Sequence, residues 1–209
     1  EYTGFKEMLD GRVKTLHPKI HSGILFKRNN KMHRKQMQKK QFEPIDLIIV
    51  NFYPFEEVLK KTSNKNQIIE NIDIGGPSMV RAAAKNFNDV SVITDKKDYS
   101  ELISELNKLR GKTSLDFRRK MASKAYNLTA YYDSIVSEWF NKEIGVEFPE
   151  RKTFFGKKIK QLRYGENPHQ KSSIYINSLK SNDTKLDQLS GKDLSYNNYN
   201  DIFAGLDIL

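Results

Sequence analysis

The chain has 209 residues, of which 37% are hydrophobic and 30% charged, and this predicts a globular protein of one large domain, or of one domain and part of another. The absence of cysteine excludes disulfide bonds, thiolate metal sites and a cysteine nucleophile, and no apolar run reaches the roughly 20 residues of a membrane-spanning helix, so we expect a cytoplasmic location. The net charge of +10 favours an anionic partner, which includes nucleic acids, membrane surfaces and phosphorylated small molecules.

The first third of the chain is predicted to contain loops, one helix and two strands. Residues 1–26 hold glycines and a proline between short apolar groups, and we expect loops that end in a brief strand. Residues 29–41 are polar and rich in helix formers, which predicts an exposed helix. Residues 45–50 form an almost unbroken aliphatic run, which predicts a parallel strand buried on both faces. Asn51 and Tyr53 follow at its carboxyl end, where open α/β sheets bind ligands.

Strands and helices alternate in the middle of the chain. Residues 77–86 follow a glycine pair and predict an Ala-rich helix, with proline at its first position, where its missing N–H is not needed. A second strand is predicted over 90–94, and amphipathic helices over 99–109 and 115–141. This alternation predicts a doubly wound α/β layer in which helices cover a parallel sheet.

The pattern of residues changes after the long helix. Residues 143–149 contain a glycine and a proline that break the helix, and from Lys152 onward the chain reads as short, strand-like pieces separated by turns. We therefore place a domain boundary near residue 149. Because the chain starts without a methionine and stops within an apolar pattern at 202–206, we expect an internal piece of a longer protein.

A basic loop near the start is a candidate anion site. Arg12, Lys14 and Thr15 lie beside Gly11, and a guanidinium with an ammonium and a hydroxyl suits phosphate or a developing oxyanion. An ordinary basic surface loop is an equally good interpretation. His17 and His21 are four residues apart, but Pro18 between them argues against a shared metal-binding helix face, so no metal site is expected.

Other polar residues each have a structural alternative. Tyr53 and Asn51 could donate hydrogen bonds into a pocket, whereas in isolation Tyr53 is better explained by ring packing. Asp73 precedes the pair Gly75 and Gly76, and it could act in the site or only cap the helix that follows. Lys85 could be merely a cation near the negative end of that helix. Serine-triad, phosphate-loop and dinucleotide-binding motifs are absent from the sequence.

Taken together and in order, five segments resemble motifs of the bifunctional phosphoribosylaminoimidazolecarboxamide formyltransferase and inosine monophosphate (IMP) cyclohydrolase family of purine biosynthesis. The segments are RVKTLHP at 12–18, NFYPF at 51–55, DIGG at 73–76, RAAAKN at 81–86 and RYGENPHQ at 163–170. The resemblance implies a cyclohydrolase domain over 1–148 with a methylglyoxal-synthase-like α/β fold, lacking its N-terminal strand and phosphate loop. It implies that 149–209 begin a formyltransferase domain with a cytidine-deaminase-like fold.

The resemblance also implies roles for individual residues. The positions that match nucleotide-contacting residues of the family are Arg12, Val13, Thr15, Val50, Asn51, Ile74, Gly75 and Gly76. Lys85 matches the proton donor and acceptor of the ring closure, and Lys14, Tyr53 and Asp73 match groups that polarise and orient the substrate. Lysine transfers protons best when nearby cations or burial lower its pKa, and Arg12 and Lys14 are the neighbours expected to do so. These five side chains should therefore converge on one pocket.

In the second domain, the matching substrate-binding positions are Arg163, Tyr164, His169 and Asn198. The implied ring closure needs no cofactor, whereas the full-length formyltransferase uses 10-formyltetrahydrofolate as cosubstrate. The family's Lys-His catalytic pair is not among these residues, so we do not expect formyl transfer by this chain alone. The implied partner is a phosphorylated purine-precursor nucleotide rather than a nucleic acid or a membrane, and the implied assembly is a homodimer.

Two other functions remain open at this stage. The same fold serves as a regulatory module that senses small phosphorylated ligands, although Asn167, Pro168, His169 and Gln170 argue against that alternative. The second alternative is nucleic-acid binding by a basic stretch. Its residues are Lys27, Arg28, Lys31, Arg34, Lys35, Lys39 and Lys40. No Phe, Tyr or Trp lies among them to stack on bases, so a solvated helix face is the favoured interpretation.

Overall fold

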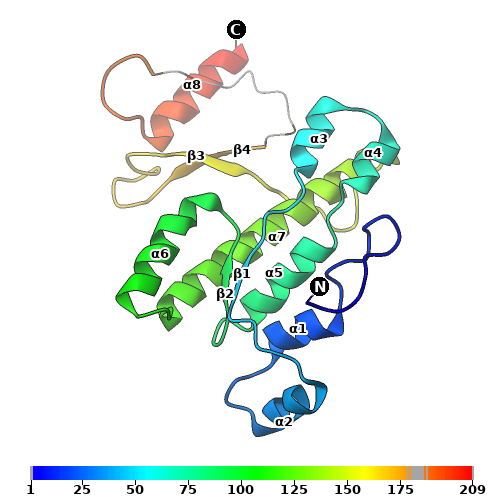
Figure 1. Ribbon diagram of the computed structural model, residues 1–209. Coiled ribbons are helices and arrows are strands. Elements are labelled where there is room, and N and C mark those ends of the chain that lie inside the picture. Colours follow the sequence, from blue (N-terminus) through cyan, green and yellow to red (C-terminus); the bar gives the residue numbers. More distant parts are fainter. Residues whose placement is uncertain (1, 178, 180–185, 187, 209) are drawn as a thin grey trace. The chain divides into compact units, whose positions relative to one another are not determined.

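The computed structural model describes all residues except 1, 178, 180–185, 187 and 209 (Figure 1). The chain divides into two compact units, Glu1–Glu147 and Phe148–Leu209. Among the described residues, no helix combines the length and the apolar character needed to cross a bilayer.

The first unit is an α/β structure. Its elements in chain order are α1 (Pro18–Leu25), α2 (Lys31–Lys40), β1 (Leu47–Ile49), α3 (Phe55–Lys61), α4 (Lys65–Glu70), α5 (Gly75–Lys85), β2 (Ser91–Ile93), the 3-10 turn η1 (Lys96–Asp98), α6 (Tyr99–Lys108) and α7 (Leu115–Glu143). Strands β1 and β2 pair in parallel, with Leu47 opposite Ser91 and Ile49 opposite Ile93. The connection between them runs through α3, α4 and α5, as a parallel crossover requires.

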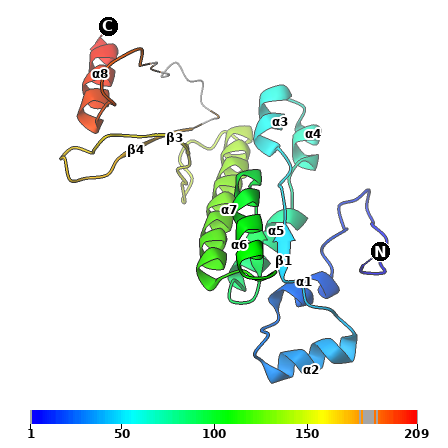
Figure 2. The same ribbon diagram turned by 60° about the vertical axis from the view of Figure 1, so that its left-hand side comes forward.

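The core of this unit lies where α5 and α7 pack on the strands. Helix α5 contacts α1, α7 and both strands, and α7 also contacts β2 (Figures 1 and 2). The small residues Ala82, Ala83 and Ala84 are buried in α5, which lets the helix approach its neighbours closely. Because α5 follows β1 and runs back past it, the helix begins next to the carboxyl end of that strand.

Several predicted elements are confirmed. Helices α2, α6 and α7 and strands β1 and β2 lie within a few residues of the predicted ranges. The prediction that β1 is buried on both faces is wrong, since Ile48 is in the core but Ile49 is 49% exposed. Within the described residues β1 is bonded to one strand only, so it is less enclosed than β2, which is buried throughout.

Two local predictions need correction. Residues 18–25 form helix α1 rather than loops and a strand, because the Nδ1 atom of His17 accepts a hydrogen bond from the Lys19 N–H at 3.1 Å and Pro18 occupies the first turn. Helix α5 begins at Gly75, two residues before the predicted Pro77 start. The carboxylate of Asp73 accepts the Gly76 N–H at 2.8 Å and so supports this earlier start.

Helices α3 and α4 were not predicted, although the sequence carries signals for both. In α3, Glu56 and Glu57 lie in the first turn and Lys60 and Lys61 in the last, which suits the helix dipole. In α4, the side chain of Asn64 caps the helix by accepting the Gln67 N–H at 3.2 Å. Both helices are short, so the period of their apolar residues is hard to recognise.

The second unit contains a hairpin and a helix. Strands β3 (Lys157–Gln161) and β4 (Ser173–Ile176) pair antiparallel, with a register shift between Lys158 and Lys160. Helix α8 (Tyr196–Ile208) follows. Ser195 and Asn198 form a reciprocal cap at its start, because the Asn198 oxygen accepts the Ser195 N–H at 3.0 Å and the Ser195 hydroxyl accepts the Asn198 N–H at 3.4 Å.

Candidate functional site

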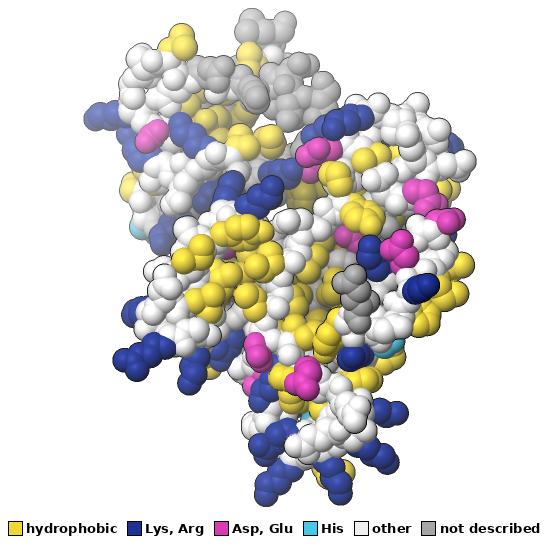
Figure 3. Space-filling model, viewed as in Figure 1, with side chains coloured by type: hydrophobic (Ala, Val, Ile, Leu, Met, Phe, Trp, Pro, Cys, Tyr) yellow, Lys and Arg dark blue, Asp and Glu magenta, His cyan; other side chains and the backbone are white. Residues whose placement is uncertain are grey.

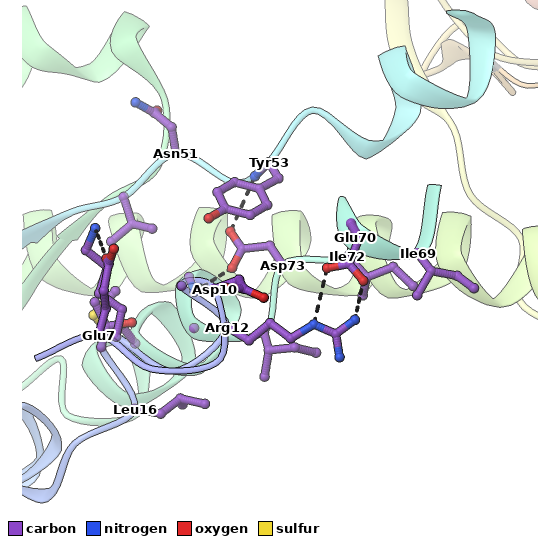
Figure 4. A pocket seen from close by; sticks show the side chains of 18 residues that line it. Glu7, Asp10, Arg12, Leu16, Asn51, Tyr53, Ile69, Glu70, Ile72 and Asp73 are labelled. Atoms are coloured by element: carbon purple, nitrogen blue, oxygen red, sulfur yellow. Dashed lines mark hydrogen bonds and ion pairs between the residues drawn. The ribbon is translucent and has the colours of Figure 1, made fainter. Parts of the chain in front are cut away.

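A cavity of about 700 Å³ lies at the carboxyl end of β1, in the first unit. Its walls come from the loop before α1, the segment after β1, the end of α4, and the turn that leads into α5 (Figure 4). The predicted site residues that line it are Arg12, Lys14, Thr15, Val50, Asn51, Tyr53, Asp73, Ile74, Gly75 and Gly76. The structure therefore gathers residues that are more than 60 positions apart in the sequence.

Asp73 is fixed between two walls of the cavity. One carboxylate oxygen accepts the Gly76 N–H at 2.8 Å, and the other accepts the Tyr53 N–H at 3.3 Å (Figure 4). The helix-capping interpretation of Asp73 is thus correct as far as it goes. Two accepted bonds leave further lone pairs on a carboxylate, so Asp73 can still accept a proton or a hydrogen bond from a ligand.

The glycine pair at the start of α5 allows two walls of the cavity to lie close to this end of the helix. A Cβ atom on Gly75 would lie 2.6 Å from the Thr15 hydroxyl oxygen, and one on Gly76 would overlap the Asp73 carboxylate. The absence of these Cβ atoms places Thr15 and Asp73 against the N-terminal end of an 11-residue helix. The N–H groups and the dipole at such an end attract anions.

Each cation of the cavity is held by a carboxylate. The Arg12 guanidinium forms an ion pair with Glu70, and the Lys14 ammonium lies 3.0 Å from a Glu7 oxygen. The hydrogen bond and charge of Glu70 raise the pKa of Arg12, and those of Glu7 raise the pKa of Lys14. In turn, the hydrogen bond from Arg12 lowers the pKa of Glu70. Lys14 therefore stays protonated at neutral pH and is suited to stabilise negative charge rather than to act as a base.

Tyr53 is not a packing residue. Its side chain is 56% exposed and lies beside Asp73 on the cavity wall, so the interpretation of Tyr53 by ring packing alone is wrong. Asn51 is likewise exposed at the cavity. Both follow β1 directly, where the end of the strand turns their side chains out of the core.

The predicted convergence fails for Lys85. It is the last residue of α5, whereas the cavity borders the first residues of the same helix. At 1.5 Å per residue, the ten steps from Gly75 to Lys85 correspond to roughly 15 Å. Arg12 and Lys14 are therefore not the neighbours of Lys85. Val13 also lies outside the lining, in a β-bridge with Met8.

Sequence reasoning missed part of the lining. The additional residues are Glu7, Asp10, Gly11, Leu16, Ile69, Glu70, Ile72 and Met79. Leu16, Ile69, Ile72 and Met79 add apolar surface to the polar groups, as in many small-molecule sites. Glu7 and Glu70 have no local pattern that marks them, since their importance comes from partners 7 and 58 positions away.

The described residues contain no group of three or more His, Asp or Glu side chains placed to hold a metal ion. His17 uses its Nδ1 atom to cap α1, and His21 lies within that helix. His17 is therefore the N-cap residue of α1, whereas His21 is part of the helix itself.

Comparison with known protein families assigns both halves of the chain. A model described as "MGS-like domain" matches residues 1–78, and one described as "AICARFT/IMPCHase bienzyme" matches residues 83–209. The chain belongs to the AICARFT/IMPCHase bienzyme family. The two matches meet inside α5, so they divide the chain at a different point from the two compact units.

Relatives of this bienzyme chain share its whole length. "Bifunctional purine biosynthesis protein PurH" of Bradyrhizobium diazoefficiens is 49% identical over 210 residues, and the proteins of the same name from Persephonella marina and Thermoanaerobacter sp. are each 47% identical. The alignments cover 100% of this chain and 40–41% of those proteins. A solved structure titled "Crystal structure of ForH" matches with a TM-score of 0.58 and 32% identity, covering 66% of this chain and 71% of that one.

The remaining predicted residues of the bienzyme chain lie in the second unit. Arg163 stacks its guanidinium over the Tyr164 ring at 4.8 Å and donates a hydrogen bond to the Tyr164 hydroxyl at 3.2 Å. His169 is exposed in the loop after β3, and this loop is closed by the Gly165 N–H donating to the Gln170 carbonyl at 2.9 Å. Asn198 is engaged in the cap of α8. Arg163 and Tyr164 thus form a pair, whereas Asn198 has a structural role that explains it locally.

Proposed function

We propose that residues 1–148 form an IMP cyclohydrolase domain and that residues 149–209 begin a formyltransferase domain. The first activity is the dehydrative ring closure of 5-formamidoimidazole-4-carboxamide ribotide to IMP, in purine biosynthesis. The observation that carries the proposal is the meeting of Lys14, Tyr53 and Asp73 around one cavity beside the start of α5. The names of the relatives support the pathway.

The reaction is an intramolecular condensation. The carboxamide nitrogen attacks the formyl carbon, an N–C bond forms, and the formyl oxygen takes up a proton to give a hydroxyl group. The proton that the formyl oxygen takes up balances the one that the attacking nitrogen loses. The hydroxyl then takes up a second proton and leaves as water, while the former formamido nitrogen loses its proton as the C=N bond forms. Such a step needs the two reacting ends held together, stabilisation of the developing oxyanion, and proton transfer, but no cofactor.

The cavity offers a group for each requirement. The protonated Lys14 is suited to stabilise the oxyanion, the Asp73 carboxylate to accept a proton from the attacking nitrogen, and the exposed Tyr53 hydroxyl to orient the formyl group. The substrate phosphate fits Arg12, Thr15 and the N–H groups at the start of α5. The phosphate then replaces the Glu70 carboxylate as the partner of Arg12.

The role that the resemblance implies for Lys85 has no support in this geometry, since Lys85 lies at the far end of α5. A Lys85→Leu variant of the complete gene product decides the matter. Unchanged cyclisation removes Lys85 from the mechanism, whereas loss of cyclisation with unchanged IMP binding assigns it a chemical role that the cavity of the single chain does not explain.

The proposal is tested with the complete gene product and synthetic 5-formamidoimidazole-4-carboxamide ribotide, by following IMP formation through absorbance. Lys14→Leu should lower kcat/KM by about 100-fold or more, because it removes a preorganised donor to an oxyanion. Lys6→Leu is the matched control, since Lys6 is also an exposed lysine of the N-terminal loop but does not line the cavity. A wild-type protein that binds the nucleotide without converting it would favour the regulatory module.

For the second unit, we propose that Arg163 and Tyr164 bind the nucleotide substrate of formyl transfer, with His169 and Asn198 in motifs near that site. The cosubstrate of the complete enzyme would be 10-formyltetrahydrofolate. Arg163→Ala should weaken binding of 5-aminoimidazole-4-carboxamide ribotide, measured by calorimetry, more than Lys171→Ala does.

A homodimer and a cytoplasmic location remain predictions, as does the absence of nucleic-acid and membrane partners.

A further inference from the structure

Tyr132 of α7 connects two walls of the cavity without lining it. Its side chain is buried, with 7% of its surface exposed, and it lies beneath the segments 52–55 and 71–73. The first of these segments carries Tyr53 and the second carries Asp73. The side chain of Tyr132 therefore contacts the two chain segments that carry these proposed functional residues.

The ring of Tyr132 packs on the segment that follows β1. Its centroid lies 5.2 Å from that of Phe52 in an edge-on arrangement and 6.1 Å from that of Phe55. Edge-to-face aromatic pairs at these distances are favourable and have a defined geometry. Since Phe52 and Phe55 flank Tyr53 in the chain, these contacts fix the backbone from which the Tyr53 side chain extends.

The hydroxyl of Tyr132 holds the second segment. It accepts the Asp73 N–H at 2.7 Å and donates to the Asn71 carbonyl at 3.4 Å. Burial raises the pKa of Tyr132, so the hydroxyl keeps its proton at neutral pH and can serve as donor and acceptor together. The Asp73 carboxylate in turn accepts the Tyr53 N–H, which closes a chain of contacts from α7 through both walls.

We infer that Tyr132 is a positioning residue for the ring closure, which holds Asp73 in register with Tyr53 through its hydroxyl. The inference rests on the proposed cyclohydrolase function. A small displacement of a reacting group is sufficient to slow catalysis strongly, even when substrate binding is little changed. The hydroxyl is the informative part of the side chain, because the ring also serves the core.

The test is a Tyr132→Phe variant of the complete gene product, which keeps the ring and removes the hydroxyl. We expect kcat for ring closure to fall about tenfold, with KM within about twofold of wild type. The kcat value is calculated per IMP-binding site, measured by calorimetry, so that a loss of folded protein is not counted as a loss of catalysis. Tyr131→Phe is the matched control, because it makes the same change on the same helix and removes a bond to Glu56, which does not line the cavity.

A double-mutant cycle separates positioning from a general structural effect. If Tyr132 acts through Asp73, adding Tyr132→Phe to an Asp73→Asn variant should change kcat by less than about twofold. The inference is overturned if the two effects multiply, or if Tyr132→Phe and Tyr131→Phe give the same kcat. Failure of the proposed function looks different, because the wild-type protein itself would then form no IMP.

Discussion

Two glycines decide how closely the side chains of the cavity walls approach each other. Gly76 matters most, because a Cβ atom there would lie 3.0 Å from the Asp73 carboxyl carbon and overlap one of its oxygens. The carboxylate belongs to the same tight turn and cannot move away without losing its bonds to the Gly76 and Tyr53 N–H groups.

We therefore predict that Gly76→Ala lowers the rate of cyclisation by about tenfold or more, since it displaces Asp73 from the cavity wall. The measurement is kcat/KM with the formamido nucleotide. Gly205→Ala is the control, because a Cβ atom at Gly205 in α8 would have none of the described residues within 4 Å, apart from its own stretch of helix. Equal rates for the two variants would show that the position of Asp73 is unimportant.

His21 makes the stability of the first unit depend on pH. The Nε2 atom of His21 is buried and has no hydrogen-bond partner among the residues that the structure describes, and burial lowers the pKa of this histidine. The unfolded chain, with an ordinary histidine pKa of about 6.5, then binds the proton more readily than the folded chain. The stabilising contribution is present above pH of about 6.5 and declines as the pH falls below it.

We predict that the urea midpoint falls less between pH 7.5 and pH 5.5 in His21→Gln than in the wild-type protein. Fluorescence of Trp139 reports the transition, because it is the one tryptophan of the chain and lies in α7. His169→Gln, an exposed change in the second unit, should leave the pH dependence as it is. An identical pH response in His21→Gln would contradict the account.

Local motifs in the sequence revealed most of the cavity, and three-dimensional contacts explain what they did not reveal. Arg12, Lys14 and Asp73 stand out because each lies within three residues of Gly11 or Gly75, in segments that resemble family motifs. Glu70 and Tyr132 do not stand out, since one lies at the end of a short polar helix and the other among the core aromatics of α7. Their partners are 58 and 59 positions away.

At the scale of helices and strands, one asparagine joins α5 to α1. Asn86, at the end of α5, is 7% exposed, and its amide donates to the carbonyls of Ile24 at 2.8 Å and Phe26 at 3.1 Å. The Ile24 carbonyl belongs to the last turn of α1 and the Phe26 carbonyl to the C-cap of this helix, where intrahelical donors are lacking. Asn86 at the end of α5 thus supplies hydrogen bonds to carbonyl groups at the end of α1.

Asn86→Ala should destabilise the first unit by about 1–3 kcal/mol, because it leaves the buried Ile24 carbonyl without its side-chain donor, whereas the Phe26 carbonyl keeps a hydrogen bond from Arg28 at 2.9 Å. Urea unfolding followed by Trp139 fluorescence measures the change. Asn88→Ala, an exposed asparagine two positions further on, should change the stability by about 0.5 kcal/mol or less. Similar losses in both variants would mean that the two bonds to α1 carry no special stability.

The elements that the sequence predicted well are those with strong periodicity. The 29 residues of α7 repeat apolar positions over many turns, and all three residues of β2 are buried. Helix α1 was mistaken for loops because its histidine cap and internal glycine resemble turn signals. The exposure of Ile49 also could not be foreseen, since it depends on which elements cover β1 rather than on the run of residues itself.

At the scale of the whole chain, charge is distributed unevenly. The cavity is lined by Arg12, Lys14 and four acidic residues, whereas the stretch 27–42 carries seven Lys and Arg residues and no acidic one. Lys and Arg side chains accordingly gather over α2 (Figure 3). The net charge of +10 is thus mainly a property of this exposed helix and its flanks, and it does not by itself identify the ligand of the cavity.

The division into two compact units leads to a prediction for the chain as a whole. Residues 146–156 form no helix or strand, and Phe148 and Phe154 within them are 88% and 90% exposed. Exposed backbone outside regular elements is the preferred substrate of proteases. Brief digestion with chymotrypsin should therefore leave a stable product whose carboxyl end is Phe148 or Phe154, as determined by mass spectrometry. A double variant with alanine at both positions should lose this product. A stable product that instead ends within α7, for example after Phe140, would contradict the division at Glu147.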